Sequence, residues 1–259
     1  MKPFVLAIGI LAALPSLGFA DNPFIVEVVS YTQTSDGIPG APSFFSFQAG
    51  YDASLDYSGI TVTSPGTASP VALQNLGGKT WEGIDSSYKS ASSFNAAYPN
   101  GQYIFTQTGS IAPGISVVNL TGGFPVEPVF TGSSLTNLTT IRPDSPITVT
   151  FNGLSADEIA SSTITLEVSN TPNPLGGFVY HLNSTATQFT FAPDTFIPGD
   201  HYTMDLLYEG PGLEASRVNI TTVTFTAAVP EPADFFYFAS GFITLVFMSA
   251  RSFRDKVTG

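Results

Sequence analysis

Short runs of alternating apolar and polar residues fill the chain between residues 21 and 228. The clearest runs are residues 147–151, 164–168, 189–191 and 202–206, and glycine or proline clusters separate most of them. Alternation with a period of two places apolar side chains on one face of a strand and polar ones on the other. The pattern therefore predicts an all-β fold, and the length and spacing of the runs favour a sandwich.

The chain contains no cysteine. Disulfide bonds, thiolate nucleophiles and thiolate metal sites are therefore excluded. Stability has to come from buried apolar area, and about 210 residues are enough for one large domain or two small ones.

The first part of the chain, residues 21–140, is expected to be β-rich. Residues 24–31, 43–48 and 102–107 are predicted strands, and a helix of about two turns is expected only at residues 90–98, before the turn Pro99-Asn100-Gly101. A stretch rich in serine, threonine and asparagine at residues 134–142 marks the boundary with the second part. The two parts are either separate domains or one continuous sandwich.

The second part, residues 141–228, carries the sequence Pro198-Gly199-Asp200-His201-Tyr202 just before a predicted strand. This stretch resembles an immunoglobulin-like or fibronectin-like β-sandwich module. In such modules a tyrosine near the start of this strand forms a corner, in which its hydroxyl bonds to backbone upstream; Tyr202 fits that role. In the last run, Val218 and Ile220 have one parity and Val223 and Phe225 the other, so a bulge or a change of face is expected near residue 221.

The first twenty residues have the order of a secretory signal peptide. Lys2 supplies a positive charge, residues 4–14 form an apolar core, and Gly18-Phe19-Ala20 places small residues at the positions that signal peptidase reads. Cleavage between Ala20 and Asp21 is predicted. Eleven apolar residues are too few to span a bilayer, which argues against an uncleaved anchor.

The C-terminal end has three parts in a fixed order. Val229-Pro230-Glu231-Pro232 is followed by an uncharged apolar run at residues 235–250, and then by Arg251, Arg254 and Lys256. As a helix, the sixteen apolar residues cover about 24 Å, slightly less than a bilayer core of about 30 Å. The basic residues favour keeping that end in the cytoplasm.

This tail, residues 229–259, resembles the PEP-CTERM sorting signal of exported bacterial proteins. Residues 94–108, with Tyr98-Pro99-Asn100-Gly101 before a strand, resemble a pattern in other proteins of that class. The resemblance implies that an exosortase cleaves at the Pro-Glu-Pro. It also implies a transmembrane helix that anchors the protein briefly, followed by transfer to the cell surface or the exopolysaccharide matrix. The alternative is an ordinary membrane anchor without processing.

The exported part is strongly acidic. Residues 21–230 contain seventeen acidic and four basic residues, a net charge of −13. Such a charge argues against nucleic acid or anionic lipid as a partner. Only 11% of the whole chain is charged, against about 25% in typical soluble domains, and polar uncharged residues take the place of the missing charges.

One sequence segment suggests a sugar site. Trp81 is the only tryptophan, and Glu82 and Asp85 follow it. An indole stacks on sugar faces and carboxylates accept hydrogen bonds from sugar hydroxyls, so these residues define an alternative: a secreted carbohydrate-binding or glycoside hydrolase-like protein. The competing interpretation is that Trp81 covers the core.

Other catalytic and metal motifs are weak. Two histidines and no cysteine leave a zinc site dependent on carboxylates, and no nucleophile elbow is present. Residues 52–56 offer oxygen ligands for weakly bound calcium but lack the order of an EF-hand loop. We therefore predict a non-enzymatic structural or adhesive protein without cofactor or dedicated metal. Its expected partners are signal peptidase, an exosortase and exopolysaccharide.

Overall fold

Strands make up most of the chain in the computed structural model, which describes residues 21–109, 114–170, 173–212 and 214–229. Within these ranges two short helices interrupt the strands. The first half contains β1 (Asn22–Thr32), β2 (Pro42–Asp52), β3 (Gly59–Thr63), β4 (Val71–Gly77), β5 (Thr80–Asp85), α2 (Ala91–Ala97), β6 (Gly101–Thr108) and β7 (Gly114–Leu120). The second half contains β8 (Phe130–Thr131), α3 (Ser134–Thr140), β9 (Ile147–Phe151), β10 (Thr163–Asn170), β11 (Asn173–Leu182), β12 (Gln188–Phe191), β13 (His201–Glu209) and β14 (Ala215–Thr226). The predicted β-rich fold is confirmed.

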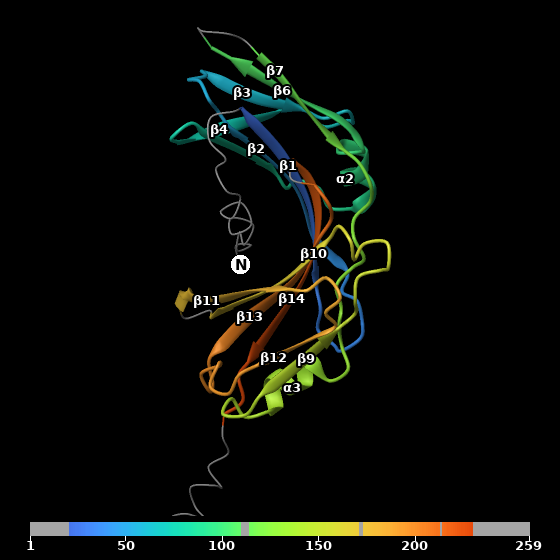
Figure 1. Ribbon diagram of the computed structural model, residues 1–259, viewed down its shortest axis with the longest axis vertical. Helices are drawn as coiled ribbons and strands as arrows, with labels where there is room; N and C mark the ends of the chain where they lie inside the picture. Colours follow the sequence, from blue (N-terminus) through green and yellow to red (C-terminus); the bar gives the residue numbers. More distant parts are fainter. Residues whose placement is uncertain (1–20, 110–113, 171–172, 213, 230–259) are drawn as a thin grey trace, which may run out of the picture.

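One sheet of eleven strands runs through both halves. Its order is β11-β10-β13-β14-β1-β2-β5-β4-β3-β6-β7. The halves join where β1 pairs in parallel with β14, from Ile25 opposite Ala215 to Thr32 opposite Thr222. The joined sheet bends into the crescent seen in Figure 1, with β1 and β14 at its middle. Seven successive residues of β1 are buried, as expected for a strand with covered faces on both sides.

The second half is a two-layer sandwich. Sheet β12-β9-β8 packs on the end β11-β10-β13-β14 of the large sheet, and side chains from both layers share one core. Of the seven strands from β8 to β14, the first, second and fifth along the chain (β8, β9 and β12) form one layer. In constant immunoglobulin domains the fourth strand joins that layer; here the fourth strand, β11, stays beside the third, β10. This is the arrangement of fibronectin type III modules, so the sandwich prediction is confirmed.

The tyrosine corner is present. Tyr202 is buried at the start of β13, and its hydroxyl accepts a hydrogen bond of 2.8 Å from the backbone N–H of Ile197. Phe196 and Phe225 pack against its ring, at 5.0 and 5.5 Å between ring centroids. The corner ties the β12–β13 connection to the core of the sandwich.

Strand β14 changes its apolar face without a bulge. Its pairing with β13 is unbroken from Thr226 to Val218. Val218 and Ile220 belong to a small cluster on the inner face of the crescent, whereas Val223 and Phe225 belong to the sandwich core on the other face. Of the two sequence interpretations, a change of face is therefore correct.

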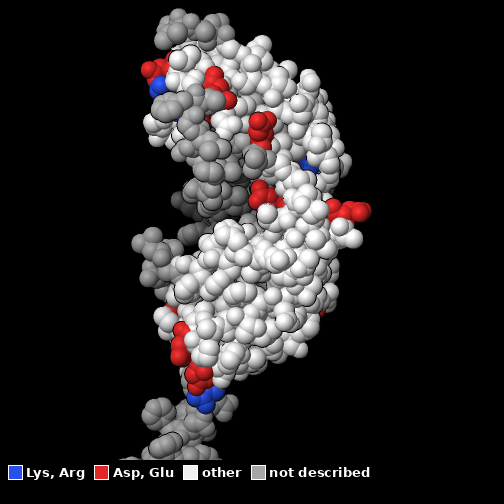
Figure 2. Space-filling model, in the orientation of Figure 1, with Lys and Arg blue, Asp and Glu red and all other residues white. Residues whose placement is uncertain are grey.

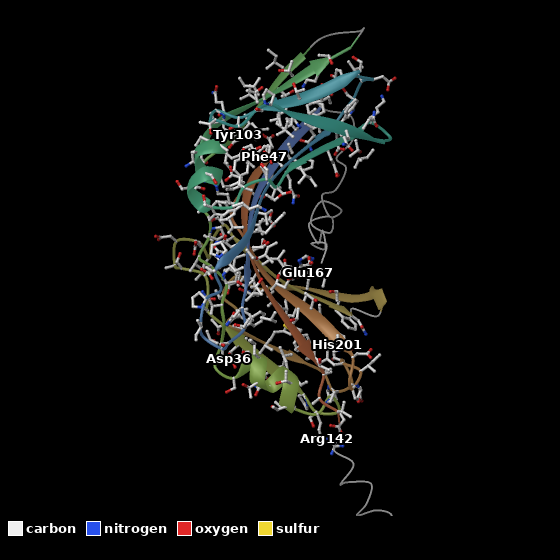
Figure 3. All side chains as sticks on the ribbon, turned by 180° about the vertical axis from the view of Figure 1, so that it is seen from behind. Asp36, Phe47, Tyr103, Arg142, Glu167 and His201 are labelled. Carbon is white, nitrogen blue, oxygen red and sulfur yellow. The ribbon has the colours of Figure 1, made fainter. Side chains whose placement is uncertain are left out.

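The first half encloses its own core. The cluster contains residues from β1 to β7 and from α2, and Trp81, Phe47 and Tyr103 are among its buried aromatic residues. Phe47 and Tyr103 lie next to each other in Figure 3, with ring centroids 5.5 Å apart. The predicted helix is confirmed as α2, with the Ser90 hydroxyl accepting from the Ser93 N–H as its N-cap.

The β1–β2 connection reaches into the second half. The side chain of Gln33 accepts from the N–H of Phe130 (2.8 Å) and donates to its carbonyl (2.7 Å), which imitates a strand partner for β8. Asp36 accepts from the N–H of Leu135 at 2.8 Å and so caps α3 from 99 residues away. These bonds fix the two halves to each other beyond the shared sheet.

Helix α3 was not expected from the sequence. It occupies residues 134–140, part of the stretch interpreted as a boundary, and Ser134 and Leu138 are buried in it. Leu138 and Phe130 both belong to the sandwich core, so that core draws on residues before position 141. Serine and threonine have modest helix propensity, and here the cap from Asp36 and the burial of Leu138 compensate for it.

Candidate functional site

The predicted sugar-contact residues lie on strand β5 rather than in a loop. Trp81 is only 6% exposed and belongs to the core of the first half, so its indole face is not available to a ligand. Glu82 and Asp85 have opposite parity on the strand and therefore point to opposite faces of the sheet. The structure does not bring these three side chains together on one surface.

The two carboxylates also differ in environment. Asp85 accepts hydrogen bonds from the hydroxyls of Tyr98 (2.7 Å) and Ser87 (2.8 Å). Burial alone would raise the pKa of Asp85, but these hydrogen bonds outweigh it and lower the pKa. For Glu82, burial and the negative charge of Asp52 raise the pKa. Asp85 is thus committed to holding α2 against β5.

The two carboxylates of the calcium candidate at residues 52–56 differ in their surroundings. Asp52 ends β2 and accepts from the Thr80 hydroxyl at 3.0 Å, while Asp56 is exposed. Within the described residues, no three side chains among histidine, aspartate and glutamate lie close enough together to hold a metal ion.

The most polar buried site lies where the halves join. Arg217 of β14 donates from Nε to Oε2 of Glu27 on β1 at 2.7 Å, and these side chains are 7% and 0% exposed. The guanidinium also donates to Oδ1 of Asn100 at 2.7 Å and to the carbonyl of Gly122. It lies over the ring of Phe124, 5.2 Å from the centroid. We call this group the junction network.

The segment 98–103 builds one side of the junction network. The hydroxyl of Tyr103 donates to Oε1 of Glu27 at 3.1 Å and to the carbonyl of Pro99 at 2.9 Å. Asn100 also donates to the carbonyl of Gly122 at 2.9 Å. Residues of the segment 94–108, whose sequence resembles a pattern in PEP-CTERM proteins, thus surround a buried ion pair.

Sequence reasoning missed the junction network, although one signal was available. Glu27 stands inside the apolar run at residues 24–31, where a carboxylate requires a partner because a buried, unpaired charge is costly. Arg217 is one of four basic residues in the range 21–230, but nothing in the sequence connects it to a residue 190 positions earlier.

A second pair of acidic residues faces the inside of the crescent. Glu167 on β10 lies directly opposite Asp205 on β13, which in turn lies opposite Thr222 on β14. Figure 3 places Glu167 on this inner side. Burial raises the pKa of Asp205 to about 6, although the Thr222 hydroxyl donates to it, and the charge of Glu167 adds to the rise. Burial also raises the pKa of Glu167.

The predicted processing sites flank the folded region. Asp21, the first residue after the predicted signal peptide, accepts from the N–H and hydroxyl of Ser54 (2.8 Å each) and from the hydroxyl of Tyr57 (2.9 Å). Burial would raise the pKa of Asp21, but these bonds lower it. At the other end, β14 stops at Thr226 and Val229 is 65% exposed.

The remaining residues of the predicted signals lie outside the described part of the chain. They are Ala20, Pro230, Glu231, Pro232, the apolar run 235–250, Arg251, Arg254 and Lys256. Of the helices that the structure describes, neither is long and apolar enough to cross a membrane.

Comparisons with known proteins give no family. No family model and no curated protein matches the chain. Among solved structures, the chicken CNTN1 FN1-FN3 domains align at 8% identity and a TM-score of 0.31, covering 80% of this chain and 69% of that one. The human OSCAR ligand-binding domain aligns at 12% identity and a TM-score of 0.24, covering 79% and 97%. Similarity at this level supports no argument, and the fold assignment rests on the strand order alone.

Proposed function

We propose that this chain is an exported structural or adhesive protein of the bacterial cell surface or extracellular matrix. The observation that carries the proposal is the order of sequence signals around one folded region. A signal peptide precedes residue 21, and the Pro-Glu-Pro motif, apolar run and basic tail follow residue 228. By resemblance to PEP-CTERM proteins, an exosortase is the proposed processing enzyme.

The structure supports the proposal through the position of the motif. The last strand ends at Thr226, and Ala227 still donates its N–H to the carbonyl of Asp200. The Pro-Glu-Pro begins three residues later, and Val229 just before it is 65% exposed. A processing enzyme approaching this point would not have to unfold the sandwich.

The charge of the surface is in line with the proposed extracellular location. Figure 2 shows a face with few charged side chains, and acidic groups prevail among them. A carbohydrate-active function is not advanced, because it relied on an accessible Trp81.

The intact mass of the protein recovered from the surface and medium of its host tests the proposal. Loss of residues 1–20 together with the segment after the Pro-Glu-Pro is the expected result. A Glu231→Ala variant should keep its tail and stay with the membrane fraction, whereas Glu214→Ala, an acidic residue of the folded part, should be processed normally. Wild-type protein that retains residues 235–259 would overturn the sorting proposal and leave a membrane-anchored surface protein.

A further inference from the structure

Strand β7 forms one end of the eleven-stranded sheet. It pairs with β6 in unbroken register, from Gly101 opposite Leu120 to Gln107 opposite Gly114. Among the described strands no other pairs with it. One edge of β7 therefore has backbone N–H and C=O groups without a strand partner, and the strand also lies close to β1 and β14.

The other sheet ends carry features that discourage such pairing. The small sheet ends in β12 with four residues and β8 with two, and short edge strands offer few bonds. At the far end of the large sheet, β11 contains Pro174, which has no N–H to donate. Strand β7 has seven residues and contains no proline, no charge and no bulge. It therefore lacks both the short length of β8 and β12 and the proline of β11.

The outer face of this edge carries exposed aliphatic residues. Ile115 is 71% exposed and Val117 is 43% exposed, and Ile104 on β6, opposite Val117, is 37% exposed. Neither β6 nor β7 contains a charged residue. Two copies of a chain with a net charge of −13 over residues 21–230 repel each other across most orientations. Contact through this uncharged edge avoids that repulsion.

We propose that β7 pairs antiparallel with β7 of a second copy of this chain, which joins the two large sheets across a two-fold axis. The end of β7 turns toward β14, because Gly122 accepts from Arg217, so the pairing is centred on the earlier part of the strand. When Ser116 lies opposite the partner's Ser116, Ile115 lies opposite the partner's Val117. The two-fold axis repeats this contact between Val117 and the partner's Ile115. Side chains alternate with a period of two, so this register keeps both aliphatic residues on one face. An isologous contact of this kind closes as a dimer rather than a fibre.

Sedimentation equilibrium tests the association. The protein is purified from its host, and its intact mass is recorded to give the mass of the monomer. A dimer is expected for the wild type. Val117→Lys should weaken dimerisation at least tenfold, because it puts two ammonium groups into the apolar contact. The control is Ile84→Lys on β5, since Ile84 is 45% exposed and the charge change is the same; this variant should remain dimeric. If Val117→Lys does not fold, Ile115→Lys serves in its place.

Disulfide trapping tests the register, since the chain has no cysteine of its own. Opposed residues on paired strands have Cβ atoms about 4.5–5.5 Å apart, close to what a disulfide requires. An equimolar mixture of Ile115→Cys and Val117→Cys single variants should give covalent dimers faster than either variant alone. Equal rates in all three samples would overturn the register.

A monomeric wild type, or equal responses to lysine at positions 117 and 84, would overturn the pairing itself. So would a monomer that binds an unrelated extended peptide along β7. These outcomes do not depend on the fate of the C-terminal tail, so the sorting proposal and the dimer proposal can fail separately.

Discussion

Replacing Arg217 by methionine should be among the most destabilising single changes in this protein. The substitution removes the hydrogen bonds of the guanidinium to Glu27, Asn100 and Gly122 and keeps most of the side-chain volume. Glu27 is then left fully buried with one hydrogen bond, the 3.1 Å bond from the Tyr103 hydroxyl.

The expected cost follows from that isolated carboxylate. Removing one partner of a buried ion pair typically costs about 3–5 kcal/mol, because the remaining charge has neither water nor a counter-ion. A typical domain has a free energy of unfolding of about 5–15 kcal/mol, so the loss is a large fraction of the total. Arg142→Met is the matched control: Arg142 is exposed and paired with Asp144, and its loss should cost at most about 1 kcal/mol.

The pH dependence gives a second signature. Burial raises the pKa of Glu27, and Arg217 opposes that rise. Without Arg217 the pKa of Glu27 rises further above its value in the unfolded state, so lowering the pH protonates the buried carboxyl group and removes part of the cost. The loss in free energy of unfolding caused by Arg217→Met should therefore be smallest at low pH and should grow as the pH rises above about 4.5.

Urea titration followed by the fluorescence of Trp81, the only tryptophan, measures these free energies. The double variant Glu27→Gln/Arg217→Met should be more stable than Arg217→Met alone by at least about 2 kcal/mol, because no charge is left unpaired. The reasoning is refuted if Arg217→Met costs less than about 1 kcal/mol. It is also refuted if the effects of the two single substitutions simply add in the double variant.

Three further predictions concern single side chains. Asp205→Asn should stabilise the protein relative to wild type by up to about 3 kcal/mol above pH 6 and by much less at pH 4, since the raised pKa makes ionisation of Asp205 costly; urea titrations at both pH values check this. Tyr202→Phe leaves the N–H of Ile197 without its acceptor and should lower the free energy of unfolding by about 1–3 kcal/mol in the same assay. An unchanged free energy would show that the tyrosine corner does not stabilise the sandwich. Asp36→Ala removes the cap on the Leu135 N–H and should cost about 1 kcal/mol, with faster hydrogen exchange confined to α3; unchanged exchange there would contradict the capping.

Several strands could be predicted because the alternation of apolar and polar residues is a local property. Residues 147–151 and 202–206 show it plainly, and both lie in strands of the sandwich. The helix at α2 was also readable, since Ser90 caps it and the turn at Pro99 ends it. Tyr202 was assigned correctly because a corner depends on residues only five positions apart.

Other features depend on contacts between distant residues, and no local pattern encodes them. Helix α3 is a serine- and threonine-rich segment that a carboxylate 99 residues away caps, so its sequence suggested a boundary. The sequence leaves two roles open for Trp81, a ligand contact or a cover for the core, and its place inside the sheet decides for the core, since only 6% of the side chain is exposed.

The sequence by itself determined the all-β character and the tyrosine corner, and it predicts the signals at the two ends, because each follows from neighbouring residues. Only the tertiary structure decided that β1 pairs with β14, that Glu27 meets Arg217, and that β7 is left as an open edge. These outcomes depend on which strands become neighbours. Strand pairing uses backbone groups that every residue shares, so the choice of neighbour is made by packing and burial across the whole sheet.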